Sequence, residues 1–205
     1  MLKNKLIFIN LITLLLTSII LINYLILFFI FEENKIFINV LLYILIITFF
    51  VLYSGFNFLY LKILFLLLII LALGDASEDW DAWAIWLFKS KRIFYDQSIF
   101  GVLDGYAPFS NNDQPLLAPS FSASLAVFFN KWNNIFPKVG FLLISFPPLI
   151  YSLNLFRDNF NFLFICLTVY IINTFFVNGL VDGLISLYMV FSAYLAFKIF
   201  VLNNY

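Results

Sequence analysis

Apolar side chains occur along this chain in long runs, and short polar stretches separate them. Runs that approach the roughly 20 residues of a transmembrane helix lie at 6–31, 36–54, 56–73, 139–156, 160–177 and 183–202. The pattern predicts an all-α fold, a polytopic integral membrane bundle of about six spans within a single membrane domain, residues 1–205. Seven spans result if the segment 116–130 also crosses.

Three of these segments have features of their own. The first run, 6–31, carries no charge, is longer than the apolar region of a signal peptide and has no small-residue cleavage site after it, so we expect an uncleaved transmembrane helix. The run at 139–156 contains Pro147 and Pro148, which predicts a kink or two half-helices. The segment 116–130 contains Pro119, is rich in Ser and Ala, and as a helix rises only ~22 Å. We expect it to be re-entrant or to lie on the surface, with a short true span as the alternative.

The distribution of basic residues predicts the orientation. If the N-terminus is cytoplasmic and 116–130 does not cross, most basic residues near span ends fall on the cytoplasmic side, as the positive-inside rule requires: Lys3, Lys5, Lys62, Arg157 and Lys198. Residues 74–138 then form one large extracytoplasmic loop, and Asp182 returns to the same face. The expected location is the cell (inner) membrane, with several passes.

Composition supports this class and excludes others. The chain is 64% hydrophobic and 11% charged, against about 25% charged residues in soluble domains, so lipid must surround most of it. Acidic and basic residues balance at 11 each, which favours no nucleic-acid partner. The absence of histidine excludes a Ser-His-Asp hydrolase, a His-ligated metal and a His-ligated haem. Asn is abundant as a matter of composition, so an isolated Asn within a span carries little weight.

Charge is concentrated between Gly74 and Asp96. Asp75, Glu78, Asp79 and Asp81 would each cost about 2.5–3.5 kcal/mol at the centre of a membrane helix, so they must lie at the water boundary. Projected on an ideal helix, one side carries Asp81, Lys89, Arg92 and Asp96, and the other carries Trp83, Trp86, Leu87, Ile93 and Phe94. Such a helix is expected in the membrane plane with its tryptophans at headgroup depth.

This stretch has a structural interpretation and a functional one. Ser77 is a good N-cap, carboxylates in a first turn complement the helix dipole, and tryptophans form interfacial belts. However, Asp113 precedes one apolar segment and Asp182 opens the last, and ionisable residues at such positions suggest function. Acidic positions beside a Lys/Arg helix at headgroup level suit a phosphorylated lipid, whose phosphate the cations would hold while a carboxylate takes a proton.

Three motifs carry a family resemblance. The sequences WDAWAIWLFKSKRIFYD (80–96), NDQPLLAPSF (112–121) and NGLVDGLISLY (178–188) resemble, in this order, stretches of the GT-C superfamily. The nearest likeness is to bacterial relatives of the protein mannosyltransferases and of the aminoarabinose transferases that act on lipid A. The resemblance implies an enzyme that transfers a sugar from a polyprenyl-phosphate donor on the extracytoplasmic side of the membrane.

The resemblance also implies roles for individual residues. Asp81, with Asp79 beside it, matches the catalytic or metal-associated acid, and Lys89 matches a recurring basic position. Asp113 and Asp182 match two further acids, although Gln114 stands where Tyr is usual.

In the mechanism we expect, Lys89 and Arg92 hold the donor phosphate, and Asp81 or Asp79 acts as general base. Glu78 is an additional acidic site residue. A divalent cation, Mg or Mn, can be held by Asp79, Asp81 and Asp182, but the sequence does not require one.

The length of the chain suggests alternatives to a complete enzyme. Members of the superfamily normally continue with several more helices, so the resemblance implies half of a split enzyme, a truncated product or a non-catalytic relative. One alternative to an enzyme is therefore a membrane subunit that partners a second polypeptide. Another is a transporter of a small solute or lipid, which the few ionisable residues in the spans disfavour.

Overall fold

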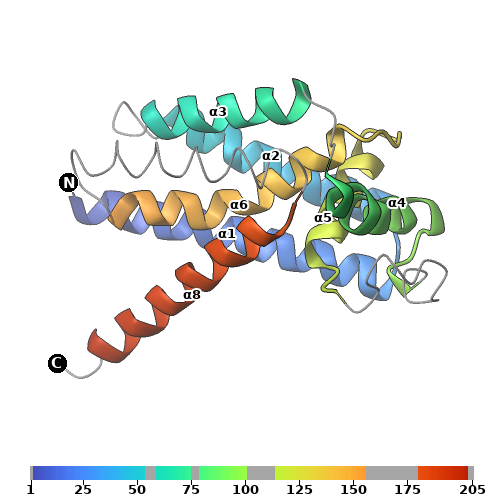
Figure 1. The fold of residues 1–205 in the computed structure, drawn as a ribbon. Coiled ribbons are helices and arrows are strands. Elements are labelled where there is room, and N and C mark those ends of the chain that lie inside the picture. Colours follow the sequence, from blue (N-terminus) through green and yellow to red (C-terminus); the bar gives the residue numbers. More distant parts are fainter. Residues whose placement is uncertain (1, 54–58, 75–78, 101–113, 156–179, 203–205) are drawn as a thin grey trace.

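Helices make up the part of the chain that the structure describes. The computed structural model describes residues 2–53, 59–74, 79–100, 114–155 and 180–202, and within these ranges it contains helices and turns but no strand, which confirms the all-α prediction there. In chain order the helices are α1 (Leu2–Phe29), α2 (Glu33–Tyr53), α3 (Leu59–Gly74), the π-helix η2 (Ala82–Trp86), α4 (Leu87–Asp96), α5 (Leu117–Phe128), α6 (Phe136–Leu155) and α8 (Asp182–Leu202) (Figure 1).

Among the described helices, two are long and apolar enough to cross a membrane, over Ile7–Phe29 and Glu33–Leu52. Four shorter apolar helical stretches are also present in the described ranges, within α3, α5, α6 and α8. The run predicted at 160–177 lies outside the described residues, and so do 75–78 and 101–113 of the predicted loop 74–138.

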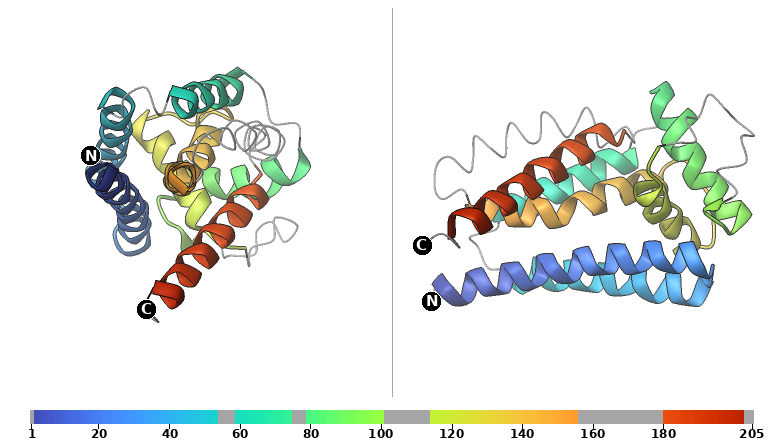
Figure 2. Two further views of the ribbon diagram at one scale, coloured as in Figure 1. Left: turned by 90° about the vertical axis from the view of Figure 1, so that its left-hand side faces the viewer. Right: turned by 90° about the horizontal axis from the view of Figure 1, so that it is seen from below.

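The long helices lie lengthwise beside one another, and α4 and α5 gather at one end (Figures 1 and 2). The start of α1 and the end of α8 are at the opposite end. Gln97, just after α4, donates from Nε2 to Oε1 of Glu33 at the start of α2, over 3.1 Å. The charged stretch therefore lies at the end of the bundle where α1 turns into α2.

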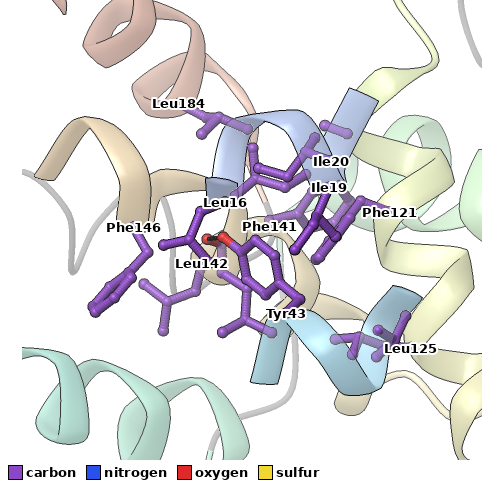
Figure 3. Packing of buried hydrophobic residues seen from close by; sticks show 14 of the residues in the cluster. Leu16, Ile19, Ile20, Tyr43, Phe121, Leu125, Phe141, Leu142, Phe146 and Leu184 are labelled. Carbon is purple, nitrogen blue, oxygen red and sulfur yellow. Dashed lines mark hydrogen bonds between the residues drawn. The ribbon is translucent and has the colours of Figure 1, made fainter. Parts of the chain in front are cut away.

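Helix α5 is an internal helix. All nine residues from Ala118 to Ala126 are buried, and α5 packs on α1, α2, α4 and α6. Phe121 and Leu125 of α5 meet Tyr43 of α2 and Phe141 of α6 in the apolar core (Figure 3). Its Ser and Ala side chains are small enough for other helices to surround it, and the expected re-entrant or membrane-surface position stays a prediction. Its 12 residues rise only ~18 Å, too short to cross a bilayer.

Small residues let α5 and α6 approach closely. A Cβ added to Gly140 of α6 would lie 2.7 Å from Cα of Ser122, which is closer than such atoms can come. Ser122 in turn donates from Oγ to the backbone oxygen of Pro137 over 2.6 Å. Close backbone approach at small residues, with hydrogen bonds between helices, is the packing that membrane bundles use.

Helix α6 continues through Pro147 and Pro148, so the predicted split into two half-helices is not observed. A proline has no amide hydrogen, so these two leave the carbonyls four residues earlier, Leu143 and Ile144, without their helical donors. Two tyrosines from other helices supply the missing hydrogens. Tyr43 of α2 donates to the oxygen of Leu143 over 2.6 Å, and Tyr188 of α8 donates to that of Ile144 over 2.8 Å.

The contact at Gly140 leads to a stability prediction. Gly140→Ala should destabilise the protein by about 1–3 kcal/mol, because the added methyl group forces α5 and α6 apart. The matched control is Gly74→Ala, where a Cβ would meet nothing within 4 Å. Unfolding in detergent micelles measures both variants. Equal unfolding free energies for the two would contradict the close packing.

Candidate functional site

The charged stretch folds into a π-turn that runs directly into α4. The amide of Trp83 donates to the carbonyl of Asp79 over 3.2 Å, and the amide of Leu87 donates to the carbonyl of Ala82, five residues earlier. A bond of this span defines a π-helix, which is rare and occurs frequently at functional sites. Asp79 and Asp81 immediately precede this turn.

Burial along this stretch departs from the helical projection at Lys89. Lys89, expected on the polar face with Asp81, is fully buried, whereas Trp83 is 54% exposed. Trp86, Leu87 and Ile93 are buried together, as expected. On the regular helix α4, Lys89 stands only about 40° from Ile93, four residues later, so one wide buried face includes both.

Lys89 lies against an aromatic ring inside the protein. Its Nζ is 5.5 Å from the centre of the Trp86 ring, a distance at which a cation is attracted to the ring face. The next residue, Ser90, is also buried and donates from Oγ to the carbonyl of Trp86 over 2.9 Å. Lys89 therefore belongs to the interface of α4, and a lipid phosphate cannot reach it without a rearrangement.

The other predicted site residues occupy different environments. Asp81 is exposed, Asp79 is half-buried, and Asp182 is the exposed first residue of α8. Arg92 donates from Nε to Oδ2 of Asp96 one turn later on α4, over 2.7 Å. Glu78 and Asp113 lie outside the described residues.

The acids are not gathered into a metal site. Among the described residues, no group of three or more His, Cys, Asp or Glu side chains is placed to hold a metal ion. Asp79, Asp81 and Asp182 thus do not form the Mg or Mn site that the sequence allows but does not require. One physical reason is spacing, since side chains two apart at the start of a helical segment do not face each other.

Sequence reasoning missed several buried polar residues. Lys138, in the first turn of α6, is as completely buried as Lys89, and Ser120 and Ser124 of α5 are also enclosed. Asn23 of α1, which composition gave no reason to single out, is 1% exposed and donates from Nδ2 to Oγ of Ser124 over 2.6 Å. A single polar residue in an apolar run gives no signal in one sequence, because nothing shows which partner it meets.

An apolar groove of about 640 Å³ lies between α1, α5, α6 and α8. Its walls carry few polar side chains, and the described lining is Thr17, Ile20, Leu21, Leu117, Ala118, Ile144, Val181, Leu184, Ile185, Tyr188, Met189 and Ser192. Such a lining suits a hydrocarbon chain and offers a sugar few hydrogen bonds. The first turns of α8 and α5 both contribute to this groove, through Leu184, Leu117 and Ala118.

No protein-family model, curated protein or solved structure matches this chain. The resemblance to the GT-C superfamily therefore remains a prediction from the three motifs.

The burial of Lys89 can be tested against a neighbour on the same helix. Lys91 is exposed and stands two residues away. An amine-reactive ester applied to the folded protein should modify Lys91 at least about tenfold faster than Lys89, because reagent and water reach only the former. Peptide mapping by mass spectrometry gives both rates. Comparable rates would show that Lys89 faces the solvent.

Proposed function

We propose that this chain is a membrane-embedded glycosyltransferase module that uses a polyprenyl-phosphate sugar donor on the extracytoplasmic side, as the GT-C resemblance implies. The observation that supports it best is the cap at one end of the apolar helices, in which Asp79 and Asp81 lead directly into the π-turn of η2. An exposed carboxylate on an irregular helix, flanked by the exposed rings of Trp80 and Trp83, offers a base and a sugar-stacking surface together.

The proposal includes a multi-pass topology in the inner membrane with a cytoplasmic N-terminus and about six spans. Helices α1 and α2 supply the two spans with the strongest support. The contact of Gln97 with Glu33 puts the charged cap and the α1–α2 turn at one end. With the positive-inside orientation, that end is extracytoplasmic.

In the proposed reaction, the carboxylate of Asp81 removes the proton of an acceptor hydroxyl. The hydroxyl oxygen attacks the anomeric carbon, the bond from that carbon to the phosphate oxygen breaks, and polyprenyl phosphate leaves with the electron pair. A single displacement inverts the anomeric centre. Asp79, half-buried one residue before Trp80, is the alternative base.

The donor is proposed to bind by its two ends. The apolar groove beside α8 suits the isoprenoid tail, and the cations of α4, Lys89 and Arg92, suit the phosphate. Lys89 can take this part only if it leaves its place against Trp86, and Arg92 only if it releases or shares Asp96. Donor binding is therefore expected to reorganise α4.

A second candidate function is that of a non-catalytic membrane subunit that completes a second polypeptide. The observation in its favour is that Asp182 does not join Asp79 and Asp81 in a common carboxylate cluster. This alternative predicts that the purified chain binds no donor and that a larger membrane protein co-purifies with it.

Asp81→Asn tests the enzymatic proposal. The change keeps the shape of the side chain and removes the base, so transfer of radiolabelled sugar from the polyprenyl-phosphate donor in membranes should fall by at least about 100-fold. Glu32→Gln, the same loss of charge in the α1–α2 turn, is the control and should leave transfer unchanged. Full activity of Asp81→Asn would remove Asp81 from the site.

Thiol labelling tests the topology. In a Cys166→Ser background, which has no other cysteine, single cysteines replace Lys35, Lys91 or Lys3. A membrane-impermeant maleimide applied to intact cells should label positions 35 and 91, because both lie at the extracytoplasmic end. Position 3 should be labelled only after the membrane is opened. If the cysteines at positions 35 and 91 were labelled from opposite sides of the membrane, the arrangement would be refuted.

A further inference from the structure

Among the described elements, α8 packs on α6 and is attached mainly through its first half. Tyr188 donates to the carbonyl of Ile144, and the ring of Phe191 meets that of Tyr151 with centroids 5.2 Å apart. Beyond this point α8 diverges from the other helices (Figures 1 and 2). Phe197 and Phe200 near its end are 66% and 72% exposed.

The bond of Tyr188 differs from an ordinary tertiary hydrogen bond. Its acceptor, the carbonyl of Ile144, has lost its helical donor because Pro148 has no amide hydrogen. An unmet carbonyl costs several kcal/mol in hydrocarbon, so this acceptor has a strong need for some donor. Since Tyr188 also lines the apolar groove, the bond that satisfies the carbonyl sets the position of one groove wall.

The corresponding hydrogen bond, from Tyr43 to the carbonyl of Leu143, has different surroundings. Tyr43 is fully buried, and its ring meets that of Phe121 edge-on with centroids 5.0 Å apart. Helix α2, which carries it, is also held by the stacked rings of Phe37 and Phe128 and by its packing on α1. Loss of the Tyr43 bond therefore leaves α2 in place, whereas α8 has no comparable set of contacts among the described residues.

We propose that α8 is a movable wall of the groove and that the hydrogen bond from Tyr188 to the carbonyl of Ile144 is the latch that holds it closed. When another donor, such as water or a hydroxyl of an entering molecule, satisfies Ile144, α8 swings away from α6 and α1, and the groove opens sideways to the bilayer. This device does not depend on the glycosyltransferase proposal, because it follows from the backbone of α6 and the shape of the groove.

Cross-linking across the groove tests the movement. In the Cys166→Ser background, Leu21→Cys of α1 and Met189→Cys of α8 place thiols on facing walls, where both native residues are exposed. A short bifunctional maleimide should join them efficiently in the latched protein. Adding Tyr188→Phe should lower the cross-linking rate by roughly tenfold, because the closed state then loses the hydrogen bond that holds it. Tyr43→Phe should leave the rate unchanged. An unaltered rate in Tyr188→Phe, or an equal fall in both variants, overturns the proposal.

A proline replacement separates the latch from general stability. In Pro148→Ala the new amide can itself donate to Ile144, so removal of the Tyr188 hydroxyl should no longer matter. Tyr188→Phe should raise the unfolding equilibrium constant about 5- to 150-fold in the natural background and less than about twofold in Pro148→Ala. If Tyr188→Phe alone does not fold, Pro148→Ala and its double variant still give the second comparison. A large effect of Tyr188→Phe in the Pro148→Ala background refutes the latch.

Discussion

Two backbone carbonyls without helical donors, those of Leu143 and Ile144, organise the helices around α6. Pro147 and Pro148 create them, and Leu143 and Ile144 are both buried inside the protein, where water does not satisfy them. The protein meets this need with tyrosine hydroxyls from α2 and α8, which are far apart in sequence. These polar contacts connect α2 and α8 to α6, which remains one helix where a kink or two half-helices were expected.

Polar contacts and close backbone approach also determine which other helices pack together. When most side chains are apolar, apolar contact favours no particular partner, so small residues and hydrogen bonds decide which helices meet. Gly140 admits the backbone of α5, and Asn23 connects α1 to that helix through Ser124. Helix α5 is too short to span a bilayer and has become the centre on which four other helices pack.

The positions of the helices could be predicted from the sequence to within a few residues, but their faces could not. The runs 36–54 and 139–156 correspond to Glu33–Tyr53 and Phe136–Leu155, because an uncharged run of that length can only form a helix in lipid. A helix that is apolar all round has no periodicity to show which side is buried. In the one amphipathic stretch, periodicity failed at one residue. Lys89 stands at the edge of the apolar side of α4, about 40° from Ile93, and the packing of that side on other helices buries it as well.

The sequence predicted which stretch of the chain carries the candidate site residues, but not which of those residues come together in space. Charge density alone located Asp79 and Asp81 at the water boundary, since their burial in lipid would cost too much. Whether Asp182 joins them depends on the position of α8, which no local pattern encodes. Asp182 stands six residues before Tyr188 on the same helix, a rise of only about 9 Å. A rotation of α8 about its contact with Ile144 must therefore carry Asp182 with it. The proposed opening of the groove therefore also changes the position of Asp182 relative to Asp79 and Asp81.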